Sequence, residues 1–206
     1  MNLKRSVLIL LLLLIASIII GLCFGAVNIM PTDLLLKSNQ SILHLRLLRI
    51  LAGILAGSGL AVSGITLQSI LRNPLAEPYL LGTSSGAGLA AVIAIIIGVS
   101  RIYMPLIAFI GAILSIIIVY SLGRDRGLIE DKSLILSGVI ISVAFSSIIV
   151  FLVSLFGNAT MHEINWWLWG SLQVYYYKLL LLVSFPVVLG ICSTYIFAQD
   201  LNAISI

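Results

Sequence analysis

Charged residues are scarce in this sequence. Asp, Glu, Lys and Arg together make up 9% of its 206 residues, whereas 61% of the residues are hydrophobic. An ordinary soluble domain carries roughly 25% charged residues. Because so few charges cannot cover the surface of a protein of this size in water, a water-soluble fold is nearly excluded. A chain surrounded by lipid needs polar groups only at its two membrane faces, so we expect a lipid bilayer as the main solvent.

Groups that carry chemistry are equally sparse. The two cysteines, Cys23 and Cys192, lie inside apolar runs without a His or Asp at ligand spacing, and His44 and His162 are far apart. We therefore expect no metal site, no cofactor and no catalytic residue. The pattern G-x-x-x-x-G-K-[ST] is absent, so any ATP must be bound by a partner. The net charge is +4, but the basic residues are scattered at the ends of apolar runs, which argues against nucleic acid.

Acidic residues are missing from the middle of every apolar run. The seven are Asp33, Glu77, Asp125, Glu130, Asp131, Glu163 and Asp200. Proton-coupled carriers and intramembrane hydrolases usually need an ionisable group at membrane depth. This absence disfavours both classes of protein.

Long apolar runs predict membrane-spanning helices. The first, Ser6 to Ile29, follows Lys4 and Arg5, whose charge favours a cytoplasmic N-terminus. Five more runs follow, each close to the ~20 residues that a span needs: Ile50 to Leu71, Leu80 to Gly98, Met104 to Leu122, Leu134 to Phe156 and Leu179 to Phe197. The run that starts at Leu80 is short and is expected to begin partway into the membrane. We predict an all-α, polytopic membrane helix bundle with six transmembrane helices.

A proline-rich segment separates the second and third runs. Pro74 and Pro78 prevent a continuous helix, and the glycines from Gly82 to Gly88 permit a tight restart. The string Gly86 to Ala91 matches the dinucleotide pattern G-x-G-x-x-A, but it lies in an apolar span without the preceding strand that this pattern requires. We expect a rigid cytoplasmic hairpin here.

Several motifs resemble the FecCD family of importer permeases. They are Arg46-Leu-Leu-Arg49, Ala61-Val-Ser-Gly64, Gln68, Asn73-Pro-Leu-Ala-Glu-Pro78, Leu81-Gly-Thr-Ser-Ser-Gly-Ala87, Leu136-Ser-Gly-Val139, Trp167-Leu-Trp-Gly-Ser171 and Leu201-Asn-Ala-Ile-Ser205. The resemblance covers essentially the whole chain. One departure is Leu48, which stands where the family usually has proline.

The resemblance implies a permease subunit of an ATP-binding-cassette importer for a ferric siderophore, haem or cobalamin, in the bacterial or archaeal cell membrane. Such subunits have about ten helices and work with a second permease subunit, two ATPase subunits and an extracytoplasmic substrate-binding protein. Residues 1–206 would form an incomplete permease domain that ends before the family's coupling helices. A secondary carrier and a truncated, non-transporting membrane fragment are the alternatives.

The resemblance also implies site residues. Arg46 and Arg49 would dock the binding protein, with a role as interface anchors as the alternative. Asn73, Leu75, Asp131 and Lys132 would form the cytoplasmic gate, although a loop packed beneath the helices explains the same residues. Small or hydroxyl side chains of the fifth span would line the pathway, or would mediate helix packing instead: Ser137, Ser142 and Ser146.

Overall fold

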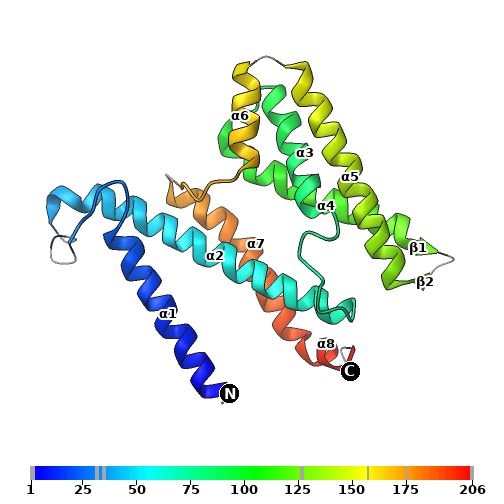
Figure 1. Ribbon diagram of the computed structural model, residues 1–206, viewed down its shortest axis with the longest axis horizontal. Coiled ribbons are helices and arrows are strands. Elements are labelled where there is room, and N and C mark those ends of the chain that lie inside the picture. The colour runs from blue at the N-terminus through cyan, green and yellow to red at the C-terminus, as the bar shows by residue number, and fades with distance from the viewer. Residues whose placement is uncertain are drawn as a thin grey trace. The chain divides into compact units, whose positions relative to one another are not determined.

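The computed structural model describes residues 3–30, 33, 36–125, 128–156, 158–174 and 176–204. Helices dominate this part of the chain (Figure 1). In chain order the elements are α1 (Leu3–Cys23), η2 (Lys37–Asn39), α2 (Gln40–Ile70), α3 (Thr83–Ile96), η3 (Arg101–Tyr103), α4 (Met104–Gly123), β1 (Arg124–Asp125), β2 (Leu128–Ile129), α5 (Asp131–Leu155), α6 (Asn158–Leu168), α7 (Tyr177–Ile196) and α8 (Ala198–Ile204). The all-α class is confirmed, with one two-residue antiparallel ladder between β1 and β2.

The described residues contain 5 helices that are long and apolar enough to cross a membrane. They correspond to five of the six expected spans. The third expected span, Leu80 to Gly98, is instead the 14-residue helix α3. At 1.5 Å per residue α3 is ~21 Å long, which is shorter than the ~30 Å hydrocarbon core. The prolines and Gly82 delay its start. The described residues thus hold five helices of spanning length where six were predicted, and α3 is the short helix that was expected to begin partway into the membrane.

The second span begins earlier than its apolar run suggests. Helix α2 starts at Gln40 and continues for 31 residues, so Arg46 and Arg49 lie inside the helix instead of before it. Leu48, where the resemblance would lead one to expect proline, is buried and lies within the continuous helix. Leucine keeps the backbone amide that proline would remove, which allows the helical hydrogen bonds to run through this position.

The chain divides into two compact units. The first comprises residues 1–58 and 172–187, and therefore holds α1, the first part of α2 and the first part of α7. In this unit α1 lies against α2 at Gly21, where an added Cβ atom would meet the Ile50 side chain at 3.4 Å. Its remaining side chains are mostly exposed, as is typical of helices that face lipid.

The second unit comprises residues 59–171 and 188–206. Its centre is the packing of α3 against α4 and α5, with α6 covering α3 and α5 (Figure 1). Fully buried side chains in this unit include Val92 of α3, Val119 of α4 and Ile164 of α6. The short α3 is enclosed by the longer helices, which satisfies the requirement that a helix ending within the membrane be surrounded by protein.

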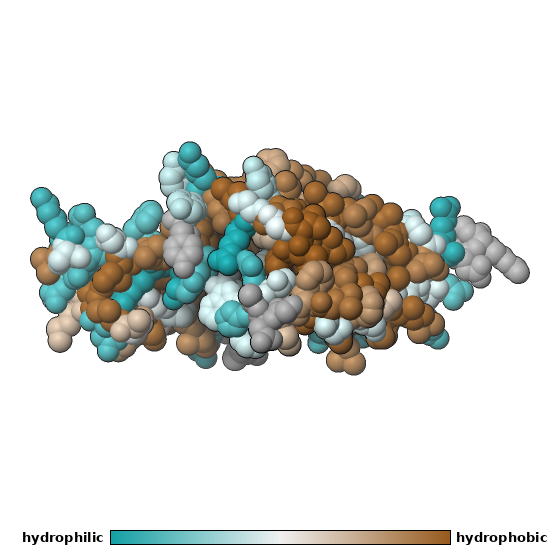
Figure 2. All heavy atoms as spheres, turned by 90° about the horizontal axis from the view of Figure 1, so that it is seen from above, coloured by the Kyte–Doolittle hydropathy of each residue, from teal (hydrophilic) through white to brown (hydrophobic). Residues whose placement is uncertain are grey.

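Apolar side chains are exposed along every long helix. They include Leu8 of α1, Ile117 of α4, Phe151 of α5 and Phe185 of α7. On the face shown in Figure 2, brown apolar side chains occupy much of the surface. A soluble protein rarely exposes so much contiguous apolar area, so this surface fits a lipid environment.

Candidate functional site

The segment between α2 and α3 is a hairpin held by its own polar groups. The Oδ1 atom of Asn73 accepts a 2.9 Å hydrogen bond from the backbone N–H of Leu75. The Gln68 amide donates to the carbonyl oxygen of Ala76 at 3.3 Å, which ties the hairpin back to α2. The hairpin thereby holds the Leu75 side chain outward, with 83% of it exposed. The expected break between the two helices is therefore present as a turn segment with its own hydrogen bonds.

The hairpin ends at Gly82, which has a φ of 72°. This left-handed conformation is costly for residues with a Cβ atom. A Cβ atom there would also lie 2.9 Å from the hydroxyl oxygen of Ser115 and 3.4 Å from that of Ser142. Glycine is therefore required at this position by both conformation and space.

Ser115 is the fully buried polar residue of α4. Its hydroxyl donates a 2.8 Å hydrogen bond to the carbonyl oxygen of Gly82. A buried hydroxyl needs such a partner, because desolvation without one is unfavourable. The bond joins the middle of α4 to the end of the hairpin and the start of α3.

Helix α5 meets the hairpin at Gly138. A Cβ atom at this glycine would overlap the carbonyl oxygen of Leu80 and would lie 3.2 Å from the Cα atom of Leu81. The two backbones are therefore in direct contact. One helical turn further, the Ile141 side chain lies 3.5 Å from the position of a Cβ atom on Gly82. Residues 138 and 141 thus present one face of α5 to the hairpin.

The opposite side of α5 carries a shallow, open groove. Its lining residues are Ser142, Val143, Ser146, Ser147 and Val150. At 100° per residue these positions centre on the side of the helix away from Ser137, Gly138 and Ile141, which are buried. Two of the three serines expected to line a pathway, Ser142 and Ser146, therefore lie in the groove. Ser137 lies on the packed side of α5 and is 8% exposed.

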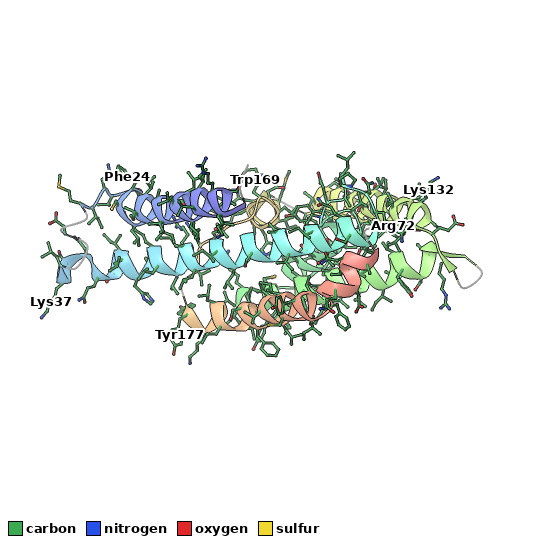
Figure 3. All side chains as sticks on the ribbon, turned by 90° about the horizontal axis from the view of Figure 1, so that it is seen from below. Phe24, Lys37, Arg72, Lys132, Trp169 and Tyr177 are labelled. Carbon is green, nitrogen blue, oxygen red and sulfur yellow. The ribbon has the colours of Figure 1, made fainter. Side chains whose placement is uncertain are left out.

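Asp131 and Lys132 stand at the start of α5, and both are exposed. Asp131 lies in the first turn of the helix, where a negative charge interacts favourably with the helix dipole. Figure 3 shows Lys132 at the same end of the second unit as Arg72, which precedes Asn73 in the chain. The second pair of expected gate residues thus lies towards the same end as the hairpin.

The two arginines of the first unit differ in their surroundings. The guanidinium group of Arg46 donates to the backbone carbonyl oxygens of Leu22 and Val27, just inside and beyond the C-terminal end of α1. A Cβ atom at Gly25 would lie 3.1 Å from Nη2 of Arg46, so the chain passes close to the guanidinium. Arg49, one turn further along α2, is exposed. Of the two, only Arg49 presents its side chain mainly to the outside.

Several residues that hold the second unit together were not predicted from the sequence. Gly111 of α4 packs against α3 so closely that a Cβ atom would lie 2.5 Å from the carbonyl oxygen of Gly86. The spacing of Gly111 and Ser115, four residues apart on one helix face, is the signal that could have indicated this crossing. The helix α6 and the 2.9 Å ion pair between Arg101 and Glu163 were also not predicted.

The described residues contain no group of three or more His, Cys, Asp or Glu side chains that could hold a metal ion. Cys23 is buried and Cys192 is exposed, and both are free thiols. The family motif that ends at Ser205 extends beyond the described residues, and its first part forms α8. The second unit offers a neutral groove and a hydrogen-bonded hairpin, and the first unit offers an exposed arginine.

Known proteins resemble this chain over most of its length. A vitamin B12 import system permease protein, BtuC, from Yersinia enterocolitica is 32% identical over 186 residues, which are 87% of this chain and 55% of the relative. A permease protein of an iron chelatin transport system from Helicobacter pylori is 36% identical over 165 residues, which are 80% of this chain and 50% of the relative. The chain thus spans about half the length of these curated relatives.

A solved structure is similar throughout the fold. It is described as a metal-chelate type ABC transporter in an inward-facing conformation, and it matches with a TM-score of 0.83 and 28% sequence identity. The match covers 98% of this chain and 64% of that chain. The sequence pattern of the FecCD transport family matches residues 12–206. The chain therefore belongs to the FecCD transport family.

Proposed function

We propose that this chain forms part of the membrane pathway of an ATP-binding-cassette importer for a metal chelate. Ferric siderophore is the cargo that we favour, and haem and cobalamin are its chemical relatives as bulky chelates. Membership of the FecCD family and the names of the relatives support this class of cargo. The chain itself would make or break no bond in the cargo.

Family membership is the observation that carries the proposal, and the shallow groove on α5 is the part of this chain that we assign to the pathway. Its lining combines the hydroxyl groups of three serines with the methyl groups of Val143 and Val150. The Ser147 hydroxyl donates to the carbonyl oxygen of Val143 at 2.8 Å, and none of the lining side chains carries a charge. A surface of this kind contacts a bulky chelate without binding it tightly, and rapid release is what a transport pathway needs.

The gate and the docking site belong to the same proposal. Asn73 and Leu75 at the hairpin, together with Asp131 and Lys132 at the start of α5, would close the cytoplasmic end of the pathway. The exposed guanidinium of Arg49 would pair with carboxylates of an extracytoplasmic binding protein, a geometry that arginine favours. Two ATPase subunits and a second permease subunit would complete the assembly.

Membrane placement follows from the ends of the spans. Lys4 and Arg5 are both exposed at the start of α1. Positive charge next to a first span tends to stay in the cytoplasm. We therefore place the N-terminus on the cytoplasmic side of a bacterial or archaeal cell membrane.

The decisive experiment is uptake of labelled cargo by the host. Deleting the gene for this chain should abolish uptake of iron-55 bound to a siderophore, and a plasmid copy should restore it. Parallel assays with labelled haem and cobalamin identify the cargo. Transport that survives ATP depletion but stops when the proton gradient is collapsed would indicate a secondary carrier and would overturn the proposal.

A variant connects this uptake to the groove. Ser146→Leu places a larger apolar side chain in the groove, and uptake should fall at least several-fold while the protein is inserted at normal levels. Ser121→Leu is the matched control, because Ser121 is an exposed serine of α4 outside the groove. Equal uptake by both variants would show that the groove is not the pathway.

A further inference from the structure

The hairpin at residues 71–82 touches two helices through unusually close contacts. The first is the 2.8 Å hydrogen bond from the buried Ser115 hydroxyl of α4 to the Gly82 carbonyl oxygen. The second is the backbone contact between Leu80 and Gly138 of α5, where no Cβ atom fits. Such contacts leave the hairpin little freedom to move relative to α4 and α5, because close-packed backbones cannot slide past each other without separating.

We propose that Ser115 and Gly138 are positioning residues that clamp the hairpin to α4 and α5, so that the hairpin moves with these helices as one body. The role of the hairpin as a gate rests on the proposed function. The clamp itself rests only on contacts within the second unit. Leu75 at the exposed part of the hairpin is then carried by any movement of α5.

Ser142 extends this connection to the groove. Its hydroxyl oxygen lies 3.4 Å from the position that a Cβ atom on Gly82 would occupy, and the same residue lines the groove. A shift of α5 that changes the groove must therefore also displace the base of the hairpin. A tilt of one helix would change the pathway and the gate together, without a separate signal between them.

Three hydrogen bonds to the Gly82 carbonyl oxygen explain why the clamp is specific. The Gly82 carbonyl oxygen accepts from the Gly86 N–H at 2.9 Å, from Ser85 Oγ at 3.0 Å and from Ser115 Oγ at 2.8 Å. The first two bonds are local to the start of α3, and only the third comes from another helix. Removing the Ser115 hydroxyl thus loosens the clamp while α3 keeps its own first turn.

The test measures the distance between spin labels on the hairpin and on α5 by pulsed electron paramagnetic resonance. Cys23 and Cys192 are replaced by serine, and spin labels are attached at Leu75→Cys and Leu136→Cys, both at exposed positions. Two samples are measured in lipid nanodiscs. The first is the purified chain alone, and the second is the complete transporter with and without trapped nucleotide. We expect one narrow distance that does not change with nucleotide.

Two variants loosen the clamp, and two others serve as controls. Gly138→Ala should push the hairpin off α5 and lengthen or broaden the distance, and Ser115→Ala should broaden it to a smaller extent. Gly123→Ala crowds the same pair of helices at Leu134, where a Cβ atom would lie 3.1 Å from the Leu134 Cα atom, away from the hairpin. Gly57→Ala adds a methyl group in open space. Both controls should leave the distance narrow.

The outcomes separate the clamp from the transport proposal. A broad or nucleotide-dependent distance in the labelled protein that keeps Ser115 and Gly138 overturns the clamp. A distance that stays unchanged in both Ser115→Ala and Gly138→Ala overturns it as well. If Gly138→Ala does not fold, Ser115→Ala decides, because it only removes an oxygen atom. The nanodisc measurement needs no transport, so a narrow distance that both variants broaden supports the clamp even if uptake is never observed.

Discussion

The guanidinium group of Arg46 binds the backbone carbonyl oxygen of Leu22 in the last turn of α1. The last carbonyl groups of a helix have no partner within the helix, and a cation there also interacts favourably with the helix dipole. Arg46 therefore joins the end of α1 to α2 across a separation of 24 residues in sequence.

Replacing Arg46 should destabilise this joint. Arg46→Ala leaves the carbonyl groups of Leu22 and Val27 without their charged donor, and hydrogen bonds to charged groups contribute ~1.5–3 kcal/mol. We expect a lower midpoint of thermal unfolding for the protein in detergent. Arg49→Ala is the matched control and should unfold close to the wild-type temperature. Equal midpoints for the two variants would contradict the assigned role of Arg46.

Arg49 should affect association with the binding protein and not the stability of the chain. Arg49→Glu reverses an exposed charge, and repulsion from partner carboxylates should lower the association rate at least tenfold, with a smaller loss at high salt. Surface plasmon resonance on transporter held in nanodiscs measures the rate. Restored binding by a Glu→Lys variant of the partner would confirm the pairing. An unchanged rate would remove Arg49 from the docking site.

Gly111 should tolerate no side chain. In Gly111→Ala the new methyl carbon would lie 2.5 Å from both the Gly86 carbonyl oxygen and the Ala90 Cβ atom. Overpacking of this kind costs ~1–3 kcal/mol, which exceeds the roughly 0.5–1 kcal/mol that alanine gains over glycine in a helix. Gly190→Ala, in a helix with open space at that position, should be neutral or slightly stabilising. Fluorescence-detected size-exclusion chromatography after heating compares the two.

Asn73 tests whether the hairpin forms a gate. Cysteines at position 73 in two copies of the chain, or at the equivalent positions of a heterodimer, should crosslink in one nucleotide state and not in the other. Cysteine at position 195 is the control, since Tyr195 is an exposed residue of α7 far along the chain. Crosslinking that is the same in every nucleotide state would show that the hairpin is only a packed loop.

The sequence alone determined the class of protein and the positions of most spans. Apolar runs of ~20 residues have few alternatives to membrane helices, because every backbone polar group must be satisfied inside the lipid. Pro74 and Pro78 likewise specified a break after α2, because proline lacks the N–H that a helix needs. The motifs around Asn73 and Gly82 indicated the family that the comparisons confirm.

Tertiary structure decided what the individual small residues do. Ser137 and Ser142 are five residues apart on one helix, and both were predicted to line a pathway. Only the packing of α3, α4 and the hairpin against α5 places Ser137 on the buried side and Ser142 in the groove. Small and hydroxyl residues serve both packing and lining, so their identity carries no information about which neighbour they meet.

The same reason applies to Arg46 and to the third span. An arginine near a membrane face can anchor the helix, dock a partner or cap another helix, and only the approach of α1 shows that Arg46 binds Leu22 and Val27. The apolar run from Leu80 to Gly98 is close to the length of a span, but its helix begins only at Thr83, and Leu80 contacts Gly138 of α5 instead. Composition and local breakers such as proline set how much of the chain lies in lipid and where it is interrupted, whereas contacts between distant segments decide which neighbour each side chain meets.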